Sequence, residues 1–244
     1  MVDIHCHILP GVDDGAKSWE IAIEMCASAV ADGIDHVVAT PHANEEFTYD
    51  RVRNASLLEE LGQKAPKGPA FSLGCDFHFS FENIQDLIRN REKYLISGTS
   101  YLLIELSDFS VSPTIDAAVS RIVTMGITPI LTHPERNMIL QSDPERIIRF
   151  AENGCVIQVT ANSITGFWGD RPKKISHWLL ERDAVHVIST DAHDLHRRPL
   201  RLSDAYETVR RTYGVEVAAY LTDHNPRAIV QIQPIPYAPA IRAK

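Results

Sequence analysis

The sequence predicts an α/β protein, and its simplest arrangement is a distorted seven-stranded parallel (β/α) barrel. Short apolar runs alternate with longer amphipathic runs, which is typical of strand–helix repeats. The short runs are rich in Val, Ile and Leu and lack regular polar alternation, as expected for parallel strands buried on both faces. Seven such runs are present, one fewer than in the common closed barrel, so a doubly wound open sheet is the alternative.

The expected strands and helices can be placed in chain order. The strands occupy residues 2–5, 36–40, 71–74, 101–106, 128–132, 156–160 and 185–190. The first helix is expected to begin after Ser18, whose hydroxyl can cap it, and to end at Gly33. Residues 143–145 resemble another helix start, with an Asp cap, a proline and an early acidic residue. Residues 201–212 are expected to form a further helix.

The composition is that of a soluble globular protein, with 44% hydrophobic and 23% charged residues among 244. No linker or repeat interrupts the chain, so residues 1–244 are expected to form one domain with a C-terminal tail from about residue 231. The net charge of −8 argues against a nucleic-acid partner, because binding to phosphates requires an excess of Lys and Arg.

The location is expected to be cytoplasmic. No basic segment precedes an apolar run at the N-terminus, and no stretch is long and apolar enough to span a bilayer, so neither a signal peptide nor membrane insertion is expected. The cysteines are scattered without a C-x-x-C pair and are expected to be buried free thiols, as suits a reducing compartment.

Histidines and acidic residues follow almost every expected strand. The first strand ends in His5-Cys6-His7, and an H-x-H pair on a strand places both imidazoles on one face. Because the loops after parallel strands meet at one end of a barrel, these side chains are expected to converge on metal ions. Glu105 lies in an apolar strand, where its carboxylate needs a cation or hydrogen bonds to offset desolvation. The nine candidate ligands are His5, His7, Asp14, His42, Asp76, Glu105, His133, Asp191 and His193.

Nine mixed nitrogen and oxygen ligands suit two or three divalent ions of Mn, Fe or Zn. Four of the nine are carboxylates, so three ions would leave the cluster at about +2, which matches a phosphomonoester dianion. The predicted chemistry is direct hydrolysis, with a water activated by the cations as the nucleophile. A cysteine phosphatase is excluded, because no cysteine begins a C-x5-R loop.

The motifs resemble those of the PHP (polymerase and histidinol phosphatase) superfamily, and within it the bacterial CpsB/YwqE-type protein tyrosine phosphatases. The likeness extends over nearly the whole chain. The residues that carry it are the opening block at 2–17, Ala39-Thr40-Pro41-His42, His133-Pro134-Glu135-Arg136-Asn137 and Asp191-Ala192-His193.

This resemblance implies a PHP fold with a three-metal, typically manganese, site held by the nine candidate ligands. Asp76 stands where the family usually has Glu, and Asp14 is favoured over Asp13 as a ligand. Arg136 and Arg198 match arginines that hold phosphate, for which a guanidinium fork is well suited. The implied substrate is phosphotyrosine on the tail of a bacterial tyrosine kinase that regulates capsule or exopolysaccharide synthesis.

Three alternatives remain open. A small-molecule PHP phosphatase, such as one acting on histidinol phosphate, would use the same metals. An amidohydrolase shares the H-x-H pair but commonly has a carboxylated Lys where this chain has Glu105. A non-catalytic module could use metals only to hold a binding surface.

Several further residues are assigned by their position alone. His196 is a candidate leaving-group acid because it is close to Arg198 in the chain. The candidates to flank an aryl ring are Phe47, Tyr49, Phe79, Phe109 and Trp168. The histidines expected to be structural or at the surface are His36, His78, His177, His186 and His224.

Overall fold

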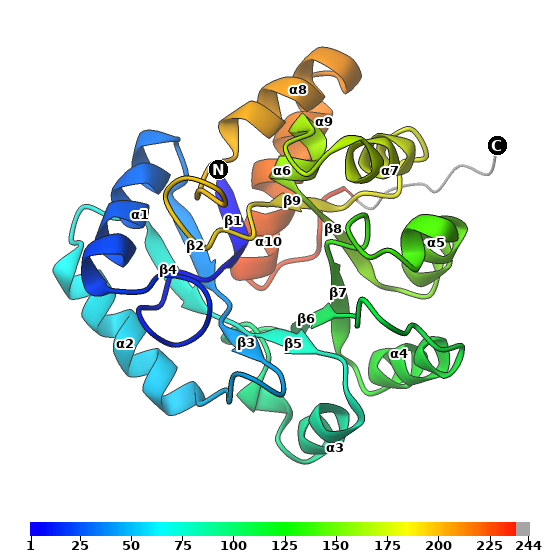
Figure 1. Ribbon diagram of the computed structural model, residues 1–244, viewed down its shortest axis with the longest axis horizontal. Helices are drawn as coiled ribbons and strands as arrows, with labels where there is room; N and C mark the ends of the chain where they lie inside the picture. The colour runs from blue at the N-terminus through cyan, green and yellow to red at the C-terminus, as the bar shows by residue number, and fades with distance from the viewer. Residues whose placement is uncertain (238–244) are drawn as a thin grey trace.

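Among the residues that the structure describes, nine parallel strands lie at the centre of the molecule and helices surround them (Figure 1). This computed structural model describes residues 1–237. One sheet has the order β1-β2-β4 and the other the order β3-β5-β6-β7-β8-β9. The strands are β1 Val2–Cys6, β2 His36–Ala39, β3 His42–Ala43, β4 Ala70–Leu73, β5 Asp76–His78, β6 Tyr101–Glu105, β7 Thr128–Thr132, β8 Val156–Thr160 and β9 Val187–Ser189.

The α/β class with parallel strands is confirmed, but the strand number differs from the seven expected. Two expected strands are each followed at once by a second short strand that pairs in the other sheet, β2 by β3 and β4 by β5. Pro41 separates the first pair and cannot donate a ladder hydrogen bond. Gly74 separates the second, where an added Cβ would come within 3.2 Å of Val38 and Ile96. A missing donor and tight packing therefore mark where these two expected strands end, and the short strand after each of them was not predicted.

The first strand connects the two sheets. On one side β1 pairs with β2, and the amide of Thr40 donates to the carbonyl of Cys6 over 2.8 Å. On its other side it is joined to the segment after β9, through hydrogen bonds from Asp191 to His5 (2.9 Å) and from His7 to Ala192 (2.8 Å). His5 and His7 therefore lie beside Asp191 although more than 180 residues separate them in sequence.

Most strands are buried on both faces, as in β1 and β8, which fits their largely apolar sequences, whereas β4 is more exposed. In β6, Leu102 and Ile104 pack in the large core under the helices, whereas Leu103 points to the opposite, inner cluster. The inner cluster consists of Val2, Ile4, Val38, Ile96, Leu103, Ile130, Val156, Val187 and Ile229. Glu105 lies two positions beyond Leu103 and on the same face of the strand. The inner face thus changes from an apolar floor to a polar site toward the carboxyl ends of the strands.

The helices surround this sheet framework, and the first of them begins as expected. They are α1 Trp19–Ala31, α2 Arg51–Lys64, α3 Phe81–Arg89, α4 Thr114–Thr124, α5 Glu145–Glu152, α6 Ala161–Thr165, α7 Asp170–Leu180, α8 Ser203–Tyr213, α9 Val215–Ala219 and α10 Asn225–Val230. Ser18 caps α1 by accepting a hydrogen bond from the amide of Ile21, as predicted. The Asp143 side chain does not cap α5, because its carboxylate bonds Arg149 over 2.8 Å instead.

The remaining expectations concern the chain ends and the thiols. All four cysteines are buried free thiols, as expected. The tail from about residue 231 is tied to α10 as far as Tyr237, whose backbone bonds the Asn225 side chain, and residues 238–244 lie outside the described residues. Within residues 1–237, no helix has the length and apolar character required to cross a membrane.

Candidate metal centre

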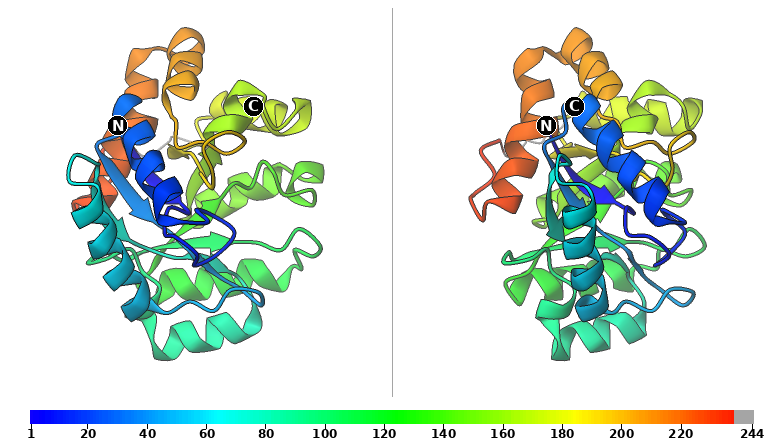
Figure 2. Two further views of the ribbon diagram at one scale, coloured as in Figure 1. Left: turned by 60° about the vertical axis from the view of Figure 1, so that its left-hand side comes forward. Right: turned by 90° about the vertical axis from the view of Figure 1, so that its left-hand side faces the viewer.

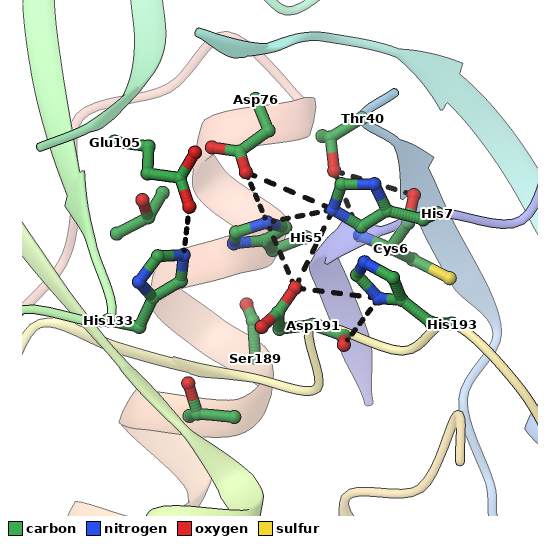
Figure 3. Close-up of polar contacts among 12 residues, drawn as sticks. His5, Cys6, His7, Thr40, Asp76, Glu105, His133, Ser189, Asp191 and His193 are labelled. Carbon is green, nitrogen blue, oxygen red and sulfur yellow. Dashed lines mark hydrogen bonds and ion pairs between the residues drawn. The ribbon is translucent and has the colours of Figure 1, made fainter. Parts of the chain in front are cut away.

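All nine predicted ligands meet in one place at the carboxyl ends of the strands. Figure 3 shows the part of this cluster formed by His5, His7, Asp76, Glu105, His133, Asp191 and His193. The nine ligands form four overlapping groups in which the ligand atoms lie within 4.8 Å of one another. The groups are His7-Asp14-His42-His193, His5-His7-Asp76, His5-His133-Asp191 and His42-Asp76-Glu105. Figure 2 shows why distant segments converge, since the loop after β1 in dark blue and the loop after β9 in gold lie over the same end of the molecule.

The shared members of these groups create a continuous cluster. The carboxylate of Asp76 lies between two imidazoles, 3.4 Å from Nε2 of His5 and 3.2 Å from Nδ1 of His42. The Asp191 carboxylate is also 3.4 Å from Nε2 of His5. Glu105 extends the cluster to His133, with 3.6 Å between Oε1 and Nε2. Carboxylates placed between imidazoles in this way could bridge neighbouring cations.

Asp76 provides the clearest test of whether cations fit here. Its side chain has no exposed surface, and neither carboxylate oxygen accepts a hydrogen bond, although two imidazoles are near. The ring nitrogens Nδ1 of His42 and Nε2 of His193 are also buried without a hydrogen-bond partner. A buried carboxylate and two buried ring nitrogens without partners are costly unless a cation satisfies them. The donor set therefore fits bound divalent ions, and the shorter Asp76 side chain still reaches the centre of the cluster.

Two hydrogen bonds orient the histidines of the H-x-H pair. Nδ1 of His7 is 2.7 Å from Oδ2 of Asp13, and Nδ1 of His5 is 3.0 Å from Oε1 of Gln158. Each bond leaves Nε2 of its ring directed toward the cluster. Asp13 is thus placed behind a ligand, whereas Asp14 lies among the ligand groups. This difference agrees with the choice of Asp14 over Asp13.

Charge strongly perturbs the acids and bases of the cluster. Burial lowers the pKa of His5, but the carboxylates of Asp76 and Asp191 outweigh it and raise the pKa to about 9. Burial and the neighbouring His193 lower the pKa of His7 to about 3. Burial and Asp76 raise the pKa of Glu105. Strongly shifted groups concentrated in one place are typical of functional sites.

Arg136 and Arg198 lie at the edge of the cluster and both bond the Asp191 carboxylate. Arg198 also lies 3.9 Å from Oδ2 of Asp14. The guanidinium carbon of Arg136 is 5.0 Å from the centre of the Trp168 ring, which supports it from one side. The two predicted arginines are therefore brought together beside the candidate ligands.

The aromatic residues predicted to flank an aryl ring differ in their position and exposure. The Phe47 ring stacks near His42 at 6.0 Å, and Phe109 is exposed, whereas Tyr49 and Phe79 are buried core residues. His78 was expected to be structural or at the surface, and its Nδ1 lies 3.7 Å from Oε2 of the candidate ligand Glu105.

His196 is exposed, and it lines a cavity beside the site instead of joining a ligand group. Gln158 and the pairing of Trp168 with Arg136 were not predicted from the sequence. The one signal for Gln158 was its position as a polar residue in an apolar strand.

Comparisons with known proteins agree with this geometry. Residues 1–231 match the family described as capsular polysaccharide synthesis, CpsB/CapC. The tyrosine-protein phosphatase CpsB of Streptococcus pneumoniae is 30% identical over 242 residues, covering 96% of this chain and 99% of its own. The tyrosine-protein phosphatase YwqE of Bacillus subtilis (strain 168) is 32% identical over 230 residues, covering 92% of this chain and 89% of its own.

A solved structure gives the same result in three dimensions. It comes from crystal structures of YwqE from Bacillus subtilis and CpsB from Streptococcus pneumoniae, described as metal-dependent tyrosine phosphatases. It superposes on this chain with a TM-score of 0.91 at 28% identity and covers 100% of both chains. The resemblance found in the motifs is confirmed, and the chain belongs to the CpsB/CapC family of capsular polysaccharide synthesis.

Proposed function

We propose that this protein is a metal-dependent phosphomonoester hydrolase that removes phosphate from phosphotyrosine. The observation that carries the proposal is the convergence of nine potential ligands around the buried, unpartnered carboxylate of Asp76, with two arginines beside them. The relatives named as tyrosine phosphatases supply the substrate class. The physiological substrate proposed is the phosphorylated tail of a bacterial tyrosine kinase that controls capsule or exopolysaccharide synthesis.

The ligands proposed are the nine residues of the four groups, and the cations proposed are three divalent ions, with manganese preferred over iron or zinc. Imidazole and carboxylate without thiolate suit these metals. When bound, the ions would supply Lewis-acid stabilisation and lower the pKa of a water. We further propose that β2 with β3, and β4 with β5, each represent one interrupted strand of a distorted seven-stranded barrel.

The chain's own residues would bind and orient the phosphate. Arg136 and Arg198 converge on one carboxylate oxygen of Asp191, so both guanidinium groups already point to a common place. A phosphate there would receive paired hydrogen bonds from each planar guanidinium. Trp168 and the Asp191 backbone carbonyl, which accepts from Nε of Arg198 over 3.2 Å, restrict where the guanidinium groups can move. Such preorganised positive charge favours a transition state with charge on the equatorial oxygens.

The decisive experiment is a phosphotyrosine-peptide assay with metal-reconstituted protein. Wild type should be active only with divalent ions, and His133→Ala and Arg136→Ala should each lose about 10²–10³-fold in rate. His224→Ala and Arg211→Ala change exposed residues of the same types and should retain activity. Wild-type activity that persists in chelator would overturn the metal-dependent proposal. Faster turnover of histidinol phosphate than of every peptide would favour a small-molecule phosphatase instead.

A further inference from the structure

A cavity of about 220 Å³ lies between α6, with the residues just after it, and the loop from β9 to α8, which also carries residues of the metal centre. Its wall includes Phe167 from one side and His196, Arg197 and Pro199 from the other. Each wall is connected to one of the two arginines of the site. Phe167 contacts Trp168 edge-to-face at 5.4 Å, and Trp168 supports Arg136. Arg197 is the chain neighbour of Arg198.

The cavity carries one uncompensated positive charge. Within residues 1–237, Arg197 forms no ion pair with a carboxylate. Arg201, which also lines the cavity, pairs with Asp204 over 2.5 Å. The nearby Asp194 does not line the cavity, and its Oδ1 atom accepts hydrogen bonds from the backbone amides of the 196–198 turn. A free guanidinium on a protein whose net charge is −8 is a local feature that attracts an anion.

The chemistry of the walls indicates which anion fits. A single net charge matches a carboxylate better than a doubly charged phosphate. Phe167, which is 57% exposed, and Pro199 offer apolar surface for the short aliphatic stem of an acidic side chain. Asn162 and Thr165 add polar groups to the same wall. A glutamate side chain combines these features.

We propose that this cavity is a subsite for an acidic residue of the substrate peptide, a few positions from the phosphotyrosine. The inference rests on the proposed function, because Arg198 must hold the phosphate for Arg197 to bind a neighbouring residue of the substrate peptide. Arg197 and Arg198 are consecutive, so the two anions bind a short distance apart. An extended peptide advances about 3.3 Å per residue, which places the acidic residue within about three positions of the phosphotyrosine.

The test uses phosphotyrosine peptides in which one Glu is moved from three positions before to three positions after the phosphotyrosine. Each peptide is compared with its Gln counterpart, and the measured quantity is the ratio of the two kcat/KM values. For the metal-loaded wild type, the ratio should reach about three to ten at one or two positions. For Arg197→Gln it should fall to about one, and for Arg197→Glu a Lys peptide should become the preferred substrate at that position.

Arg211→Gln is the matched control, because it removes the same charge from α8 about 10 Å beyond Asp204 along the helix. It should keep the wild-type ratio. A ratio near one at every position in wild type, or a ratio unchanged in Arg197→Gln, would overturn the subsite while leaving the phosphatase activity established. Failure of the proposed function is a separate outcome, in which wild type hydrolyses none of the peptides.

Discussion

Nδ1 of His7 and Oδ2 of Asp13 lie 2.7 Å apart, and both side chains are buried. The same carboxylate accepts hydrogen bonds from the amides of Gly15 (2.9 Å) and His42 (3.1 Å). Asp13 therefore fixes the orientation of one candidate ligand and the backbone position of a second. In metal sites, such partners hold the ring orientation and raise the basicity of the ligand.

Replacing this carboxylate tests its positioning role. We expect Asp13→Asn to weaken divalent-metal affinity about 10–100-fold, because the neutral amide supports the imidazole less well. Metal titration followed by calorimetry gives the affinity directly, independently of turnover. The exposed Asp170 offers a control, and Asp170→Asn should bind metal as wild type does. Equal metal affinities for Asp13→Asn and wild type would show that Asp13 does not support a metal ligand.

Metal binding is expected to stabilise the fold. The buried carboxylate of Asp76 lacks hydrogen-bond partners, so cations relieve a cost that the metal-free protein carries. At a metal concentration 100 times Kd, one site adds about 2.7 kcal/mol, which for a chain of this size raises Tm by about 5–10 °C. Thermal unfolding with and without chelator measures the shift. His42→Ala should reduce it and His224→Ala should not, whereas a Tm that is insensitive to metal would contradict the prediction.

Support of Arg136 by Trp168 gives a third prediction. Trp168→Leu removes the aromatic face 5.0 Å from the guanidinium carbon and should lower kcat/KM for a small aryl phosphate about three- to tenfold. Trp168→Phe keeps a ring and should lose less. If Trp168 acts through Arg136, Trp168→Leu should cost nothing more in an Arg136→Ala background. Additive losses in the double variant would show that Trp168 acts independently.

The ligands and the arrangement that orients them differ in how far sequence could predict them. His5, Glu105 and Asp191 could be identified because each is a metal-binding residue type at the end of an apolar run. Gln158, which bonds His5 across 153 positions, is not a typical metal-binding residue. Its one signal is a polar side chain in an apolar strand, and only folding brings it to His5. The short strands β3 and β5 were also missed, since the pairing that defines them joins segments distant in the chain, which sequence does not reveal.

A histidine remote from the metal centre should contribute to the acid sensitivity of the fold. Nδ1 of His186 accepts a hydrogen bond from the amide of Ile157 over 3.1 Å, so protonation of that nitrogen would break the bond. Burial lowers the pKa of His186 to about 4, from 6.5. Between these values the unfolded chain binds a proton that the folded chain does not, so stability falls as the pH falls. The loss between pH 7 and pH 5 should be about 2 kcal/mol.

The measurement is urea unfolding of wild type and His186→Asn at pH 7 and pH 5 in one chelating buffer. The asparagine oxygen can accept the Ile157 hydrogen bond but does not titrate. The variant should therefore lose about 2 kcal/mol less than wild type over this interval, whatever its stability at pH 7. Other titrating groups, including those of the metal centre, affect both proteins alike and cancel in the difference. Parallel pH dependences of the two proteins would show that His186 is protonated as readily in the folded chain as in the unfolded one.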